Sequence, residues 1–451
     1  MGTLLFRSTN GRSPAVNLRE AFLAGLAPDG GLYFPERFPV LAPDEIAGLT
    51  NLPYDQTAFR VLSKYMEGII PEDEFARLCR EAYDFEVPVE VIYDRVYALR
   101  LDCGPTASFK DFAAQMMARL VGRFLREDGR EVTILTATSG DTGSAVAHAF
   151  HKVPGVRVIV LFPYDEVSPR QRKLMTTLAD NVSSVAIDGK FDDCQAMVKR
   201  AFADPALKRI SLSSANSINI GRLLPQSVYY FYAASRVAKP GEPMVFSVPS
   251  GNFGDMMGAV VAKQMGLPIR KIIAPVNDND AFPRFLATGK YEKIVPSRNS
   301  LSNAMNVGHP SNLARLVAVY GGQMDETGKI HRAPDLAAMR RDLYSSSVSD
   351  ERTREAIKDA WARHKLLMEP HGAVAWRGFL DWQETESLAG LPAAIIETAH
   401  PAKFPEEIEK ALGFSPDVPP AITAAEHAPE TYERMAADYE KFKAYLLAKH
   451  T

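Results

Sequence analysis

Residues 104–112 read Gly-Pro-Thr-Ala-Ser-Phe-Lys-Asp-Phe, a turn that delivers Lys110 to the start of a helix. After this turn, apolar side chains recur at helical spacing in two adjacent rows: Phe112, Met116, Leu120 and Phe124, beside Ala113, Met117, Val121 and Leu125. Such a wide stripe predicts a well-buried helix. Lys110 therefore lies at the mouth of a buried element, where lost hydration would lower its pKa and favour a role as nucleophile or proton carrier. The alternative is a solvated lysine in a first helical turn, because lysine is rarely buried.

Beyond this helix the chain alternates apolar strands with helices. Strands are predicted at residues 131–136, 156–162, 182–187, 244–248, 272–276 and 393–397. Helices are predicted at residues 168–178, 191–202, 255–265, 310–320, 335–346, 350–367 and 430–449. Near-continuous apolar runs such as 156–162 are typical of strands covered on both faces. The alternation predicts an α/β protein with mostly parallel sheets and helices on both faces.

The chain divides into three predicted parts. Residues 1–92 form a first unit with a Pro-Asp-Gly-Gly turn and a helical pattern between residues 55 and 83. Residues 93–415 form a core of two α/β subdomains. Residues 416–429 are rich in proline and linker-like, so residues 416–451 are predicted to be a C-terminal helical tail.

Composition excludes several classes of protein. The 451 residues include 52 basic and 55 acidic side chains, a net charge of −3 that argues against nucleic acid as the main partner. Three cysteines are too few for a disulfide framework or a zinc site, and His148 and His151 have no third ligand nearby in sequence, so we expect no metal. With no signal core and no long apolar run, no membrane association is expected and the predicted location is the cytoplasm.

Three strand-to-loop junctions carry unusual residues, and ligands in open parallel sheets bind beyond the carboxyl ends of strands. Residues 136–144 are rich in Ser, Thr and Gly and could present backbone N–H groups to an anion such as a carboxylate, or could simply cap a helix. Residues 250–255, Ser-Gly-Asn-Phe-Gly-Asp, could cradle a phosphate or form a tight turn only. Thr398 follows an apolar strand and could face a shared cleft or cap a helix.

One cofactor would explain these three junctions together with a lysine. Pyridoxal phosphate needs a lysine, a cradle for its phosphate and a partner for its ring nitrogen. Segments 104–112, 136–143, 213–222, 249–255 and 397–404 closely resemble those of the threonine synthase family of fold type II pyridoxal-phosphate enzymes. The segments 25–33 and 369–375 also resemble that family, and the resemblance runs from about residue 5 to about residue 415.

The resemblance implies a fold like that of the tryptophan synthase β chain. Two open, mostly parallel sheets flanked by helices would hold the cofactor in the cleft between them, behind a family-specific N-terminal domain. It also implies conversion of O-phospho-L-homoserine and water to L-threonine and phosphate, the last step of threonine biosynthesis. We expect a monomer or homodimer. One departure is Cys103, which stands where many relatives have histidine and which could alter a hydrogen bond near the lysine turn.

The resemblance also assigns the site residues. Lys110 would hold the cofactor covalently and serve as the base. The cofactor would further contact Gly251, Asn252, Phe253, Gly254, Asp255, Thr398 and Asp141, with Thr398 at the ring nitrogen and Asp141 at the ring oxygen. The substrate would contact Ser139, Gly140, Thr142, Ser217, Asn219 and Arg222, the last three at its phosphate. Further candidates for that phosphate are Arg284, Asn303 and Lys403. Arginine suits phosphate because its planar fork makes two charge-assisted hydrogen bonds, although a surface helix arginine is the alternative for Arg222.

Three other functions stay open at this point. The chain could be a phospholyase or a serine/threonine dehydratase on the same scaffold, or a non-catalytic ligand-binding or regulatory protein that keeps the fold. A nicotinamide-dependent dehydrogenase is disfavoured, because the Gly-x-Gly-x-x-Gly fingerprint is absent.

Overall fold

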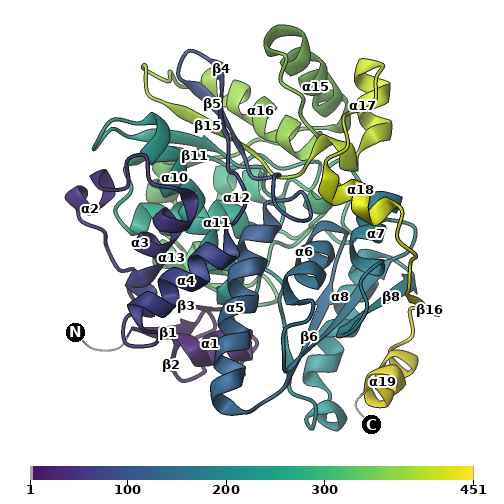
Figure 1. Ribbon diagram of the computed structural model, residues 1–451. Coiled ribbons are helices and arrows are strands. Elements are labelled where there is room, and N and C mark those ends of the chain that lie inside the picture. Colours follow the sequence, from purple (N-terminus) through teal and green to yellow (C-terminus); the bar gives the residue numbers. More distant parts are fainter. Residues whose placement is uncertain (1–3, 450–451) are drawn as a thin grey trace.

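The structure is a computed structural model that describes residues 4–449, and two larger sheets dominate it (Figure 1). The first has five parallel strands in the order β16-β8-β7-β6-β9. Their bounds are Glu433–Ala436 (β16), Val182–Asp188 (β8), Val156–Pro163 (β7), Val132–Ala137 (β6) and Leu212–Ser213 (β9). All-parallel sheets need both faces covered, and this sheet meets that requirement.

Helices cover the five-stranded sheet on both sides. One face packs on α5 (Lys110–Asp128), α6 (Asp141–Phe150) and α7 (Pro169–Thr176). The other packs on α8 (Phe191–Ala203) and α19 (Tyr439–Ala448). Neighbouring residues of β6 show the alternation, since Ile134 lies in the first core and Leu135 in the second.

The second sheet has six strands in the order β14-β11-β10-β15-β5-β4, all parallel except the β4–β5 hairpin. Their bounds are Leu343–Tyr344 (β14), Ile269–Ile273 (β11), Met244–Ser247 (β10), Ala393–Glu397 (β15), Val96–Arg100 (β5) and Val89–Tyr93 (β4). One face packs on α15 (Asp350–His364), α16 (Pro370–Gln383) and α17 (Pro405–Leu412). The opposite face packs on α10 (Ser227–Val237) and α11 (Gly254–Gln264).

Helix α5 lies between the two sheets. Phe112, Met116, Leu120 and Phe124 belong to the core of the six-stranded sheet. Ala114, Met117, Val121 and Leu125 belong to the core of the five-stranded sheet. This double packing explains the wide apolar stripe in the sequence, and it places Lys110, the first residue of α5, between the two halves of the molecule.

The N-terminal unit adds to the core of the six-stranded sheet. It contains a small antiparallel sheet of β1 (Leu5–Ser8), β2 (Val16–Asn17) and β3 (Tyr33–Pro35). Its helices are α1 (Leu18–Ala24), α2 (Pro43–Ala47), α3 (Tyr54–Met66) and α4 (Glu72–Ala82). Phe6, Phe22, Tyr54 and Phe75 all lie in that shared core, so this unit packs directly on the rest of the molecule.

Shorter elements complete the described chain. They are η1 (Pro205–Leu207), α9 (Ile220–Leu223), η2 (Leu224–Gln226), α12 (Ala281–Thr288), η3 (Asn303–Met305), α13 (Leu313–Val319), β12 (Gln323–Met324), β13 (Ile330–Arg332), α14 (Leu336–Asp342), η4 (Pro401–Lys403) and α18 (Pro420–Glu426). No helix within residues 4–449 is long and apolar enough to cross a bilayer.

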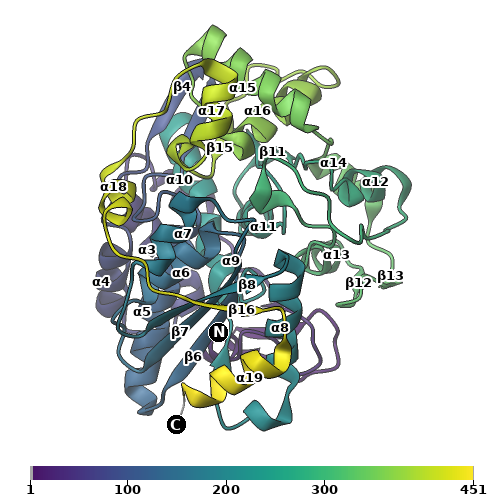
Figure 2. The same cartoon turned by 90° about the vertical axis from the view of Figure 1, so that its right-hand side faces the viewer.

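The predicted α/β class and parallel sheets are confirmed, but three local predictions are wrong. Residues 430–449 are not one helix, because Glu433–Ala436 forms β16 and pairs with β8 before α19 begins. The predicted tail is thus not only helical. It runs from α17 past α18 to complete the five-stranded sheet (Figure 2). The helix predicted at residues 335–346 ends at Asp342, where the chain enters β14, and the strand predicted at 272–276 begins earlier, at Ile269.

Candidate active site

The cleft lies where the loops that follow β6, β10 and β15 meet the start of α5. It is lined by most of the residues singled out in the sequence: Lys110, Ser139, Asp141, Thr142, Ser217, Arg222, Gly251, Asn252, Phe253, Gly254, Asp255 and Thr398. Carboxyl ends of parallel strands converge at one edge of a sheet, which is why three junctions so distant in sequence share one cleft.

The turn before Lys110 is organised by Asp111. Its buried carboxylate accepts hydrogen bonds from the Thr106 backbone N–H at 2.8 Å, the Thr106 hydroxyl at 2.6 Å and the Ser108 N–H at 3.4 Å. A side chain at Gly104 would collide with Asp111, since an added Cβ would lie 2.7 Å from Oδ2. The glycine, the threonine and the aspartate of the sequence motif therefore fix the loop that presents Lys110.

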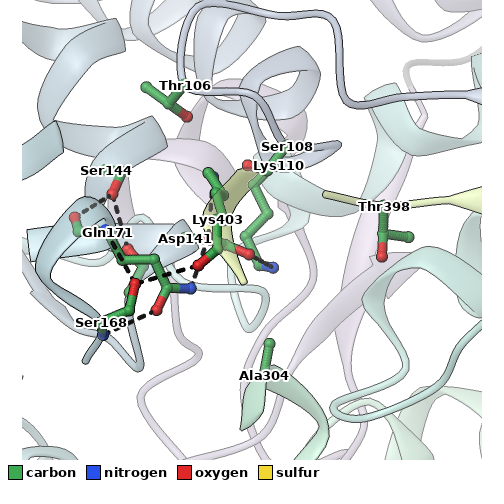
Figure 3. Close-up of polar contacts among 12 residues, drawn as sticks. Thr106, Ser108, Lys110, Asp141, Ser144, Ser168, Gln171, Ala304, Thr398 and Lys403 are labelled. Atoms are coloured by element: carbon green, nitrogen blue, oxygen red, sulfur yellow. Dashed lines mark hydrogen bonds and ion pairs between the residues drawn. The ribbon is translucent and has the colours of Figure 1, made fainter. Parts of the chain in front are cut away.

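Lys110 points at the buried carboxylate of Asp141, with 3.9 Å between Nζ and Oδ2 (Figure 3). Burial lowers the pKa of Lys110, and the nearby Asp141 charge opposes that shift. Burial alone would raise the pKa of Asp141, but the charges of Lys403 and Lys110 and a hydrogen bond from Gln171 hold it below its ordinary value. Asp141 is thus an anion between two lysines.

The 251–255 turn offers backbone donors at the start of α11. Phe253 adopts the left-handed region with φ of +63° and is the N-cap, and its side chain makes no hydrogen bond to the first N–H groups of the helix. The Asn252 amide is used elsewhere, since Nδ2 donates to Ser217 Oγ at 2.6 Å and Oδ1 accepts from the Ser311 N–H at 2.5 Å. The turn can therefore bind an anion through its backbone while the Asn252 side chain holds the turn in place.

Asp255 is buried beside this turn. Its Oδ1 accepts a hydrogen bond from the Tyr230 hydroxyl at 2.7 Å, whereas Oδ2 has no partner among the described residues. Burial raises the pKa of Asp255 to about 7, although the Tyr230 hydrogen bond and the Lys110 charge oppose the shift.

Arg222 is a buried cation with unused hydrogen-bonding capacity. Its Nη1 donates to the Ala215 carbonyl, and within residues 4–449 its Nε has no partner. Burial lowers the pKa of Arg222 to about 10, so the guanidinium stays charged at neutral pH. The Asp111 charge acts on Arg222, but no carboxylate of the described residues forms an ion pair with it. A buried charge without an ion-pair partner calls for an anionic ligand.

Arg315 on α13 supports this region without lining the cleft. Its guanidinium donates to the carbonyls of Tyr33 (2.9 Å), Ser217 (3.0 Å) and Ile218 (2.6 Å). Asn219 is likewise structural in its contacts, because its amide donates to Phe22 and Ser214 and accepts from the Gly221 N–H. These contacts tie the 213–222 segment to the N-terminal unit.

Thr398 lies opposite, at the end of β15. Its hydroxyl donates to Glu369 Oε1 at 3.4 Å, and its carbonyl accepts from the Phe109 N–H at 2.9 Å. Glu369 is the N-cap of α16 and also accepts from His371, whose Nε2 accepts from the Ala304 N–H at 3.2 Å. His371 lines the cleft, but sequence reasoning did not assign it a role. The available signal was Glu369-Pro370-His371-Gly372, an N-cap followed by proline.

Other sequence candidates lie elsewhere. Gly140 and Asn219 do not line the cleft, although Gly140 shapes it through a φ of +128° that glycine tolerates best. Arg284 is half exposed and pairs with Asp280 at 3.3 Å. Lys403 is fully buried against Asp141, and Asn303 donates to Gln171 at 3.5 Å.

The residues of the cleft fit pyridoxal phosphate. A buried lysine with its amine in the cleft, an uncapped helix start beside it and the Thr398 hydroxyl supply the three functions that the cofactor requires. Arg222 Nε, which has no partner within the described part of the chain, leaves a second place for an anion.

Comparisons with protein families agree with this geometry. Residues 88–396 match the family model described as pyridoxal-phosphate dependent enzyme. Residues 5–83 match the threonine synthase N terminus, and residues 372–446 match the threonine synthase C-terminal model.

Individual proteins resemble the chain over nearly its whole length. Threonine synthase from Pseudomonas aeruginosa is 39% identical over 432 residues, which covers 91% of each chain. The crystal structure of pyridoxal-phosphate-bound threonine synthase from Brucella melitensis superposes with a TM-score of 0.90 at 35% identity, covering 98% of this chain and 99% of that one. Threonine synthase from Escherichia coli gives a TM-score of 0.87 at 36% identity, covering 99% and 100%.

Proposed function

The chain belongs to the threonine synthase family of pyridoxal-phosphate-dependent enzymes, and from that premise we propose that it converts O-phospho-L-homoserine and water to L-threonine and phosphate. The observation that carries the substrate assignment is Arg222, a buried guanidinium in the same cleft as Lys110 whose Nε has no partner among the described residues. A substrate with both an amino group and a phosphate would use both residues.

Lys110 is the residue we assign to hold the cofactor and to move protons. When bound, pyridoxal phosphate supplies a conjugated ring that stabilises negative charge on the substrate carbons near the amino group. Lys110 then serves as the base for the α-proton, because burial lowers its pKa and favours a neutral amine. The Asp141 carboxylate at 3.9 Å can stabilise the ammonium that forms at Nζ.

The cofactor contacts follow from the same cleft. We assign its phosphate to the backbone of Gly251, Asn252, Phe253 and Gly254, beside Asp255, since α11 begins there without a side-chain cap. Thr398 is assigned to the ring nitrogen and Asp141 to the side of the ring near Lys110, because both line the cleft.

The substrate is assigned to the remaining donors. Arg222 would bind its phosphate with help from Ser217, whose hydroxyl already accepts from Asn252. Ser139 and Thr142, which line the cleft at the start of α6, would bind the substrate carboxylate, and Gly140, the N-cap of α6, would help through the shape it gives this turn. Asn219 would act indirectly, because its amide is already used in holding this segment.

Product analysis tests the assignment. The purified holoenzyme is supplied with O-phospho-L-homoserine, and threonine and phosphate are quantified together. We expect them in equal amounts. A keto acid in place of threonine would instead identify a phospholyase or dehydratase, and O-phosphothreonine in a parallel reaction would separate those two. A colourless protein that releases no phosphate would contradict an enzymatic role.

We also propose that the enzyme works in the cytoplasm on a free small molecule, as a monomer or homodimer and without nucleic acid. The near-balanced charge supports the absence of a nucleic-acid partner, and light scattering of the purified chain measures its oligomeric state.

A further inference from the structure

A buried ion pair connects the two halves of the molecule directly behind Lys110. Lys403 Nζ donates to Asp141 Oδ1 at 3.0 Å, and the two side chains are 0% and 2% exposed. Asp141 begins α6, which covers the five-stranded sheet, whereas Lys403 ends η4, which follows β15 of the six-stranded sheet. The pair therefore joins the two halves of the molecule beside the cleft, which Asp141 lines.

Neighbouring contacts fix both partners. The His400 N–H donates to the Ala107 carbonyl at 3.1 Å, which joins the Lys403 segment to the Lys110 turn. From α7, Arg170 donates to the Ala402 carbonyl at 2.5 Å, and Gln171 Nε2 donates to Asp141 Oδ1 at 3.0 Å. Lys403 and Gln171 thus both hold Oδ1 (Figure 3), while Oδ2 faces Lys110 at 3.9 Å.

That distance is too long for a hydrogen bond between Lys110 and Asp141. Five titratable groups from other parts of the chain act on the Lys110 amine: Asp141 on α6, Lys403 on η4, Arg222 on α9, Glu369 before α16 and Asp255 on α11. Burial lowers the pKa of Lys110 most, Asp141 raises it, and Lys403 and Arg222 lower it further. Lys403 is thus opposed to Asp141 in its effect on the same amine.

We propose that Lys403 is a positioning residue, which holds the Asp141 carboxylate away from Lys110 and so keeps the Lys110 amine from being captured in a close ion pair. The inference rests on the proposed function, in which Lys110 must release its proton to work as a base. Lys403 itself does not line the cleft, so it acts through Asp141 and through its charge.

A double-mutant cycle in the full-length protein, which removes the two charges singly and together, tests this role. The variants are Lys403→Met, Asp141→Asn and the double variant. For each, the cofactor-free protein is labelled with acetic anhydride across a pH series, and Lys110 modification is quantified by mass spectrometry. The midpoint of reactivity reports Lys110 titration without substrate or turnover. The visible absorption of the holoenzyme across the same pH series gives a second readout.

We expect Lys403→Met to raise the Lys110 midpoint by about one pH unit and Asp141→Asn to lower it by a similar amount, with the double variant between them. A merely structural role for Lys403 would leave the midpoint of Lys403→Met equal to that of the parent protein, and equal midpoints in these two proteins would overturn the proposal. If Lys403→Met does not fold, Lys403→Gln, which keeps a hydrogen-bond donor for Asp141 but removes the charge, makes the same test, and it must still raise the midpoint above that of the parent protein.

The result is separable from the proposed function. A protein that makes no threonine can still show a raised midpoint in Lys403→Met and a lowered midpoint in Asp141→Asn. That result would support the role of Lys403 and reject only the substrate assignment. A chain that makes threonine with unshifted midpoints would reject the role of Lys403 alone.

Discussion

The turn at residues 250–255 and the segment at residues 213–222 both present hydrogen-bond donors to one cleft, but they do so by different physical means. The turn offers backbone N–H groups at an uncapped helix start. The segment offers the buried guanidinium of Arg222. Arg315 holds this segment in place through hydrogen bonds to the carbonyls of Ser217 and Ile218. A backbone site depends on the local conformation of the turn, whereas a side-chain site depends on how the rest of the fold buries the charged group.

The largest expected effect is on turnover, and it distinguishes the chemistry at Lys110 from anion binding at the two sites. Lys110→Ala should reduce turnover by at least about 1000-fold, because it removes both the covalent anchor and the base. It should leave phosphate binding at the two sites intact, which calorimetry with inorganic phosphate measures. Lys208→Ala, at an exposed lysine, is the matched control. Full turnover in Lys110→Ala would end the assignment.

The next effect tests the side-chain site. Arg222→Ala should raise the KM for O-phospho-L-homoserine about 100-fold, since a hydrogen-bonded charge contributes about 1.5 to 3 kcal/mol. The affinity for pyridoxal phosphate, measured by titration of the cofactor-free protein, should change far less. Arg363→Ala is the control, because that side chain is 73% exposed. Equal losses for substrate and cofactor would mean that the two phosphate assignments are exchanged.

The third effect tests the backbone site. A Cβ at Gly251 would lie 2.8 Å from Met305 Cα and 2.9 Å from the Ala304 carbonyl oxygen, so Gly251→Ala must displace the turn. We expect cofactor affinity to fall about tenfold, the size of a typical overpacking cost. Gly254→Ala is the control, since its Cβ would meet nothing closer than 3.4 Å. If both variants bind the cofactor like the parent protein, the turn is not the cradle.

The smallest effect concerns the pH dependence of stability beside the turn. Burial raises the pKa of Asp255 from 3.8 to about 7, so the folded chain binds more protons than the unfolded chain between those values. The free energy of unfolding should therefore fall as pH rises through that window. Asp255→Asn removes this loss. The free energy of unfolding of the variant minus that of the parent should therefore increase by at least about 1 kcal/mol between pH 4 and pH 7.

Urea denaturation of the cofactor-free protein at several pH values measures that difference. Asp165→Asn, at an exposed aspartate, is the control and should show no such trend. A difference between Asp255→Asn and the parent that does not vary with pH would show that Asp255 keeps an ordinary titration in the fold.

Most of the fold and much of the candidate site were predictable because their signals are local. The Ser168-Pro169 helix start, the strand at 156–162 and the glycine turn at 250–254 all appear where the pattern indicates them. The strand at 433–436 was missed because Glu433 and Met435 carry no strong strand signal. Its pairing with Val185–Asp188 depends on a partner far away in sequence.

The sequence by itself determined the alternation of strands and helices, the lysine turn and the glycine-rich junctions, since periodicity and backbone geometry depend on neighbouring residues. Only the tertiary structure decided how charge is distributed in the cleft. Asp141 and Lys403 are 262 residues apart and become partners only because two sheets meet at α5. Burial and charge act through space and accumulate from every packed element, so no single stretch of the chain contains them.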